Sequence, residues 1–146
     1  MILLDTNVVS EVMRPEPEPA VIDWLNRADA GELYLSAVSV GEIEFGLDVL
    51  PEGRHKDDLC ARFKQFVARA FAYRTLPFDD QAAQRYGPIM GARRRAGRPM
   101  SAPDGQIAAI AVARGMAVAT RNVADFSDCG IEVVNPWTDR GTDREM

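Results

Sequence analysis

Four acidic residues stand where a folded chain could bring their carboxylates together: Asp5, Glu42, Asp104 and Asp125. Each follows an apolar run or lies in the first turns of a segment with helical spacing, although the spacing does not choose between Glu42 and Glu44. Crowded carboxylates repel one another unless a cation neutralises them. Oxygen ligands alone select hard ions such as Mg²⁺ or Mn²⁺. Such a site can activate a water and stabilise the leaving oxygen in phosphodiester hydrolysis.

Each of these acids also has an ordinary structural explanation. An aspartate in the first turn of a helix, such as Asp104, interacts favourably with the helix dipole. Asp125 could bond its own backbone in a turn. Asn7 could cap a helix with the help of Asp5. A metal site is therefore one of two open interpretations at each position.

The composition excludes several other chemistries. The 146 residues contain one histidine, His55, and neither a GxSxG nor an HExxH motif, which excludes Ser-His-Asp hydrolases and HExxH zinc enzymes. Cys60 and Cys129 are isolated, so neither a zinc site nor a disulfide framework is predicted. The net charge of −5 argues against nucleic-acid binding by bulk charge, but it leaves room for a local basic patch.

The length and the 47% apolar content favour one globular domain, residues 1–137, followed by a polar tail, residues 138–146, that is expected to fray. The longest apolar run is far short of a membrane span, and no basic segment precedes the first apolar residues. We therefore expect a cytoplasmic protein without a membrane association.

Strands and helices alternate along the sequence. A short apolar run predicts a strand at residues 2–4, and further strands are predicted at residues 33–36, 73–76, 117–120 and 131–134. Apolar spacing and capping residues predict helices at residues 8–13, 19–25, 40–50, 57–70, 79–95 and 101–115. Right-handed βαβ connections between these elements predict a three-layer α/β/α fold with a central parallel sheet of about five strands. Ligands of such sheets collect at the carboxyl ends of the strands, where the four acids would lie.

Basic and aromatic residues offer weaker signals. Arg93 to Arg95 and Arg98 could hold RNA phosphates beside the acids, although cations also stabilise the end of a helix without any ligand. Trp24 and Trp137 are more typical of a core or an interface than of a platform for stacked bases.

Four segments together carry a resemblance to a known family: Ile2 to Asn7, Ser39 to Gly46, Pro103 to Ala108 and Thr120 to Phe126. In order and spacing they resemble the PIN-domain ribonucleases, most closely the VapC-type toxins of bacterial toxin–antitoxin pairs, with FitB-like features. The resemblance covers nearly the whole chain. Any one motif is weak, whereas the four together are fairly specific.

The resemblance implies a Mg²⁺- or Mn²⁺-dependent endoribonuclease with Asp5, Glu42 and Asp104 as its core acids. Asp5 and Asp104 would be the direct metal ligands, and Thr6 would hold the geometry of the site. In such families a fourth acid can stand early or late after the fourth strand. The early position here is Asn122, which makes Asp125 the fourth candidate.

The resemblance also implies a homodimer and a cognate antitoxin, encoded nearby, whose peptide lies across the acidic groove. Such a peptide would be basic and would place an apolar helix beside the groove. The apolar surface expected for it comprises Val12, Met13, Trp24 and Leu25, which core packing explains equally well. The alternative function is a non-catalytic module that holds a metal and binds RNA or a partner.

Overall fold

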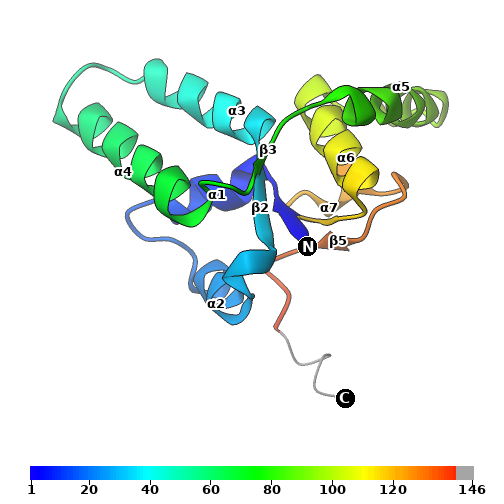
Figure 1. The fold of residues 1–146 in the computed structure, drawn as a ribbon. Helices are drawn as coiled ribbons and strands as arrows, with labels where there is room; N and C mark the ends of the chain where they lie inside the picture. Colours follow the sequence, from blue (N-terminus) through cyan, green and yellow to red (C-terminus); the bar gives the residue numbers. More distant parts are fainter. Residues whose placement is uncertain (141–146) are drawn as a thin grey trace.

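The computed structural model describes residues 1–140, which form a five-stranded sheet with helices on both sides (Figure 1). The strands are β1 (Ile2–Leu4), β2 (Leu33–Ser36), β3 (Thr75–Leu76), β4 (Ala117–Ala119) and β5 (Val133–Val134). The helices are α1 (Thr6–Val12), α2 (Pro19–Arg27), α3 (Ala37–Asp48), α4 (Arg54–Ala70), α5 (Asp80–Arg95), α6 (Ala102–Arg114) and α7 (Val123–Phe126), with a 3-10 turn, η1 (Ala30–Glu32).

The sheet is parallel throughout, with the strand order β3-β2-β1-β4-β5. β1 lies at its centre, where Leu3 pairs with Tyr34 of β2 and with Val118 of β4. Because every strand runs in the same direction, the carboxyl ends of β1, β2 and β4 share one edge. The predicted three-layer α/β/α fold with five parallel strands is confirmed.

Two hydrophobic clusters fill the two sides of the sheet, because successive strand residues point to opposite faces. Leu3 and Val118 pack toward α5 and α6, whereas Leu4 and Ala119 pack toward α1, α2 and α4. Figure 1 shows the two sets of helices on opposite sides, with α3 and α4 on one side and α5 and α6 on the other. Burial of this kind stabilises the sheet that holds the acids.

The α5–α6 pair packs closely at Gly105, the residue after Asp104. A Cβ atom placed on Gly105 would lie 2.3 Å from the sulfur of Met90 and 3.1 Å from the ring of Tyr86. Ser101 caps the start of α6, and Gly115, with φ 64°, ends it in the left-handed conformation that glycine tolerates best. The predicted bounds of this helix are confirmed, and they fix where Asp104 sits.

Several predicted elements differ in extent. α1 begins at Thr6 rather than at residue 8 because Asp5, and not Asn7, is its cap. β3 has only two of the four expected residues: Tyr73 is 98% exposed, and the N–H of Arg74 bonds the carbonyl of Phe71 in a turn. β5 lacks the first two residues of the predicted 131–134 strand, and η1 was not predicted.

The chain after β5 turns back over α2. The carbonyl of Asn135 accepts hydrogen bonds from the N–H groups of Thr138 and Asp139, and the indole of Trp24 donates to a carboxylate oxygen of Asp139 at 3.2 Å. Thr138 and Asp139 of the expected tail are therefore bonded to the domain, and residues 141–146 lie outside the described residues. Across residues 1–140, no helix is long and apolar enough to cross a membrane.

Candidate active site

Asp5 lies at the junction of β1 and α1 and is only 4% exposed. The backbone N–H of Thr6 donates to its Oδ1 at 2.8 Å, and the hydroxyl of Thr120 donates to its Oδ2 at 2.8 Å. The amide of Asn7 adds a longer bond of 3.3 Å to Oδ2. Three donors therefore hold this carboxylate in one orientation at the carboxyl end of the central strand.

Burial raises the pKa of Asp5 from its usual 3.8 to about 6. The hydrogen bonds from Thr120 and Thr6 lower that pKa, and the neighbouring charges of Asp104 and Glu42 raise it further. Desolvation is the largest cause because the charged form loses water at this depth. A cation bound here would favour the same charged form.

The hydroxyl of Thr120 can only donate toward Asp5. Its oxygen already accepts hydrogen bonds from the side-chain amide of Asn7 at 3.2 Å and from the backbone N–H of Asn122 at 3.0 Å. A hydroxyl has one proton and two lone pairs, so that proton is left for Asp5 Oδ2. Thr120 is fully buried, and its role in the site was not predicted from the sequence.

Glu42 projects from α3 and is held by a chain of hydroxyl groups. The Oγ1 of Thr6 lies 2.7 Å from Glu42 Oε1 and 2.9 Å from the Oγ of Ser39, which in turn lies 3.3 Å from the Oγ of Ser36. Because a carboxylate can only accept, Thr6 gives its proton to Glu42 and accepts the proton of Ser39. Thr6 thus holds Glu42 in the geometry observed.

Asp104 occupies the third residue of α6, and its backbone N–H bonds the hydroxyl of Ser101 at 3.3 Å. Its side chain is half-buried. Burial raises the pKa of Asp104, the hydroxyl of Ser101 lowers it, and the charges of Asp125 and Glu42 raise it. Glu42 therefore raises the pKa of both Asp5 and Asp104.

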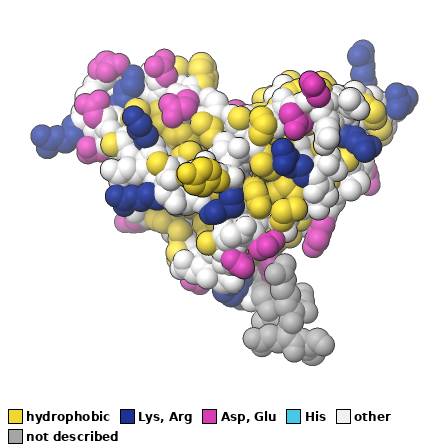
Figure 2. All heavy atoms as spheres, in the orientation of Figure 1, with side chains coloured by type: hydrophobic (Ala, Val, Ile, Leu, Met, Phe, Trp, Pro, Cys, Tyr) yellow, Lys and Arg dark blue, Asp and Glu magenta, His cyan; other side chains and the backbone are white. Residues whose placement is uncertain are grey.

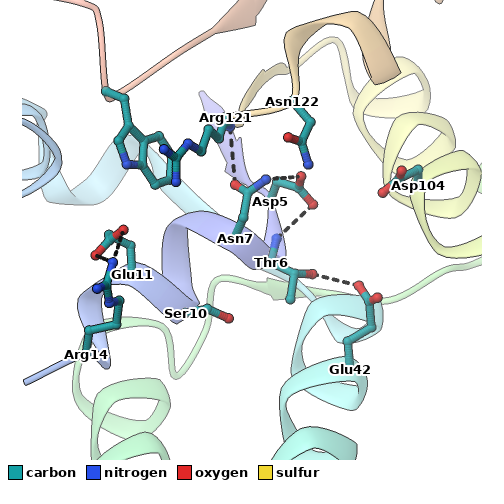
Figure 3. Close-up of a pocket in the computed structure, with 11 residues that line it drawn as sticks. Asp5, Thr6, Asn7, Ser10, Glu11, Arg14, Glu42, Asp104, Arg121 and Asn122 are labelled. Carbon is teal, nitrogen blue, oxygen red and sulfur yellow. Dashed lines mark hydrogen bonds and ion pairs between the residues drawn. The ribbon is translucent and has the colours of Figure 1, made fainter. Parts of the chain in front are cut away.

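The two candidates for a fourth site residue occupy different places. Asn122 lines the pocket, and Figure 3 shows its side chain directed toward Asp5. Asp125 is exposed on α7 and is not among the residues that line the pocket, although its charge acts on Asp104.

The acids line one open pocket of about 480 Å³. Figure 3 shows Asp5, Glu42 and Asp104 approaching its centre from three different elements, with Glu11 and Arg14 at the opposite end. Besides the expected acids, the pocket is lined by residues that the sequence reasoning did not assign to the site: Asn7, Ser10, Glu11, Arg14, Arg121 and Trp137.

The donor set fits a hard divalent cation. Mg²⁺ is usually held by one or two carboxylates, with waters and substrate phosphates completing its shell. No three Asp, Glu, His or Cys side chains in residues 1–140 are already grouped as a metal cluster. Asp5 and Asp104 can supply two carboxylates, and burial makes the charge of each costly without a cation.

Arg98 is engaged away from this pocket. Its guanidinium bonds Asp128 at 2.9 Å, the hydroxyl of Ser127 at 2.7 Å and the carbonyl of Ala124 at 3.3 Å. Arg93 is buried and also bonds the carbonyls of Ala124 and Ser127. Both arginines therefore hold the end of α7, the helix that follows Asn122.

Comparisons with known proteins identify the family. Residues 2–130 match the family described as PIN domain. The chain is 42% identical over 137 residues to the VapC ribonuclease Y4jK of Sinorhizobium fredii, covering 94% of this chain and 98% of that protein. It is 41% identical over 139 residues to the toxin FitB of Neisseria gonorrhoeae, covering 95% of this chain and all of FitB.

A solved structure gives the same relationship in three dimensions. A chain of the FitAB complex bound to an IR36 DNA fragment superposes with a TM-score of 0.90 at 41% identity, covering 96% of this chain and 98% of that chain.

Proposed function

The chain belongs to the PIN-domain family, among the VapC and FitB toxins, and we propose that it is a divalent-metal-dependent endoribonuclease that hydrolyses RNA phosphodiester bonds. One observation carries the proposal. Asp5, Glu42 and Asp104 come from three separate elements and line the same pocket. The relative named VapC ribonuclease supports RNA as the substrate.

Asp5 and Asp104 are the residues that would hold Mg²⁺ or Mn²⁺. When bound, the ion supplies activation of a water and stabilisation of the leaving oxygen. Thr120 aims a proton at Asp5 Oδ2, which keeps that oxygen an acceptor. Thr6 fixes Glu42 Oε1 at 2.7 Å and so leaves Oε2 as the oxygen that can accept a proton from an attacking water. Asn122 supplies a neutral amide at the remaining side of the pocket.

A second, apolar groove lies beside the acids, and we propose that an antitoxin partner binds there. This groove of about 360 Å³ shares Thr6, Ser10, Arg14 and Glu42 with the acidic pocket and continues over Met13, Ile43, Leu47 and Leu59. A basic peptide with an apolar helix would fit both pockets together, because its cations would face the carboxylates. The solved FitAB complex supports such a partner.

The apolar surface expected for this partner needs one correction. Met13 lines the groove, but Trp24 is 5% exposed and its indole bonds Asp139, so Trp24 belongs to the core. The homodimer and the cytoplasmic location expected from the sequence stay predictions. Two exposed apolar side chains are candidates for the dimer contact: Phe45 on α3 and Val49, the residue that caps the end of that helix.

The test is cleavage by the purified full-length chain. We expect an unstructured RNA to be cut with Mg²⁺ or Mn²⁺ and to remain intact with EDTA, and we expect millimolar Mg²⁺ to raise the Tm because it binds only the folded state. Expression should arrest growth, and co-expression of the adjacent small gene should restore it. Binding of RNA without any cleavage, under conditions where Mg²⁺ raises the Tm, would favour the non-catalytic binding module instead.

A further inference from the structure

The end of the pocket farthest from Asp104 carries two cations that the proposed hydrolysis does not use. Arg14 and Arg121 both line the pocket. The carboxylate of Glu11, itself 5% exposed, pairs with Arg14 at 3.2 Å and largely neutralises it. None of the ion pairs in residues 1–140 involves Arg121. Arg121 is thus the cation at this end whose charge no carboxylate offsets.

Arg121 is nevertheless held in place. Its guanidinium carbon lies 5.2 Å from the centre of the Trp137 ring, which is cation–π geometry. Its backbone N–H lies 3.3 Å from the side-chain oxygen of Asn7, and Thr120 before it is bonded to Asp5. An arginine stacked in this way keeps its N–H edge free to bind a phosphate.

Trp137, the residue on which Arg121 stacks, is itself held in place by hydrogen bonds. The backbone N–H of Trp137 donates to the side-chain oxygen of Asn135 at 2.9 Å. The residues that follow are bonded to α2 through Asp139, which accepts hydrogen bonds from the side chains of Trp24 and Arg27. The turn after β5 therefore carries the ring to the rim of the pocket, where it supports the arginine.

The pocket is large enough for more than one phosphate. Its volume of about 480 Å³ falls within the range of about 300–1,000 Å³ of sites that bind whole ligands. Figure 2 shows Lys, Arg, Asp and Glu side chains intermixed over the face in view. With a net charge of −5, attraction of RNA by the whole molecule is weak. Local cations must therefore position the strand.

We propose that Arg121, stacked on Trp137, binds a backbone phosphate of single-stranded RNA next to the phosphodiester held at the acids. This assignment rests on the proposed nuclease function and names the residue that places its substrate. Arg14 contributes less, because Glu11 already pairs with it. A phosphate contact of this kind fixes the register of the strand and carries no base preference of its own.

Kinetics with a short unstructured RNA test the proposal. We expect Arg121→Gln to raise KM about tenfold, to change kcat less than about threefold, and to reduce the slope of log KM against log salt by about 0.7, the value for one lost phosphate contact. Arg121→Lys should keep the salt slope but raise KM in part, because it keeps the charge and loses the planar stack. Trp137→Leu should behave like Arg121→Lys.

The matched control is Arg85→Gln, which removes one exposed positive charge from α5, outside the pocket. It should leave KM and the salt slope unchanged. The Mg²⁺-induced rise in Tm should stay the same in Arg121→Gln, because Arg121 does not hold the metal. Equal effects of Arg121→Gln and Arg85→Gln would overturn the proposal, as would a loss confined to kcat.

Equilibrium binding separates this proposal from the nuclease assignment. Fluorescence anisotropy of a labelled RNA is measured on the Asp104→Asn protein, with and without Arg121→Gln, or on the wild type if it does not cleave. Tenfold weaker binding without wild-type cleavage would support the role of Arg121 and refute the nuclease function. Cleavage by the wild type with unchanged binding in Arg121→Gln would support the nuclease function and refute the role of Arg121.

Discussion

Asp5 and Asp104 are both aspartates at the start of a helix, yet they differ in burial and in the hydrogen bonds they receive. Asp5 is 4% exposed, caps α1 and receives hydrogen bonds from Thr6, Thr120 and Asn7. Asp104 is half-buried in the first turn of α6, where Ser101 is the one hydrogen-bonding neighbour that lowers its pKa. The carboxylate of Asp5 is therefore oriented before any metal binds, whereas that of Asp104 is more exposed to solvent.

This difference teaches how a buried charge is tolerated without a cation. The hydrogen bonds from Thr120 and Thr6 offset part of the desolvation of Asp5 but leave its pKa near 6, so burial still outweighs them. Asp104 has fewer donors and keeps more water. We therefore expect the two residues to have similar importance for metal-dependent activity and different effects on the stability of the metal-free fold.

The largest expected effect is the loss of cleavage when either ligand is neutralised. Asp5→Asn and Asp104→Asn should each reduce RNA cleavage at least about 100-fold, a loss typical of removing one key electrostatic group. Asp58→Asn, an exposed acid on α4, is the control and should cleave normally. Wild-type rates in either ligand variant would refute its assignment.

The same pair of variants should separate in stability. Both remove a charge that burial disfavours, but Asp5→Asn also turns an amide toward the donors Thr120 and Asn7. Each buried donor left without a partner costs about 1–3 kcal/mol. In EDTA at pH 7, urea unfolding should therefore show a larger gain in stability for Asp104→Asn than for Asp5→Asn. The opposite order would contradict the contrast drawn between the two sites.

Thr120 offers a way to make Asp5 more like Asp104. Thr120→Val removes the proton aimed at Asp5 Oδ2, so the pKa of Asp5 should rise further and cleavage should fall about 10–100-fold, as for other groups that orient metal ligands. Thr120→Ser keeps the hydroxyl and should restore both the rate and its pH profile. A purely structural role would lower the Tm without moving the pH midpoint of cleavage.

The placement of the acids was predictable because it follows from sheet geometry. Apolar runs located the strand ends, and parallel pairing brings those ends to one edge, which put Asp5, Glu42 and Asp104 together. Trp137 and Arg121 could not be paired in advance, since their contact depends on the turn after β5. No sequence pattern specifies how such a turn folds back.

Some predicted ends of strands were wrong, also for a physical reason. The sequence predicts a strand over residues 73–76, but Tyr73 points into solvent and only Thr75 and Leu76 pair with β2. An edge strand needs few paired residues, so its length depends on its neighbour rather than on its own composition. The sequence identified Thr120 only as part of a motif. That its hydroxyl donates to Asp5 follows from the two hydrogen bonds it accepts from Asn7 and Asn122, which only the structure shows.

The next effect is the dependence of folding stability on pH. The pKa of Asp5 is higher in the folded protein, about 6, than the usual 3.8, so folding is favoured below pH 3.8 and this contribution is lost as the pH rises through 6. The difference corresponds to about 3 kcal/mol at most. The metal-free protein should thus lose stability between pH 4 and 6.

Metal binding should show the opposite trend with pH. Protons compete with Mg²⁺ for Asp5, so the affinity for Mg²⁺ should fall about tenfold for each pH unit below 6 and level off above it. Titration of the Mg²⁺-induced Tm shift from pH 5 to 8 measures this. An affinity independent of pH in that range would mean that Asp5 is not a ligand.

The smallest effects should come from the fourth position, where Asn122 lines the pocket and Asp125 acts from outside it. Asp125→Asn removes a charge that raises the pKa of Asp104, so it should change cleavage less than about threefold, in keeping with an exposed charge. Asn122→Asp adds a carboxylate beside Asp5 and should increase the Mg²⁺-induced Tm shift while lowering stability in EDTA. Asn122→Ala, which adds no charge, is its control. If Asp125→Asn instead reduced cleavage as strongly as Asp104→Asn, the late acid would be a ligand, and α7 would have to move toward the pocket when the metal binds.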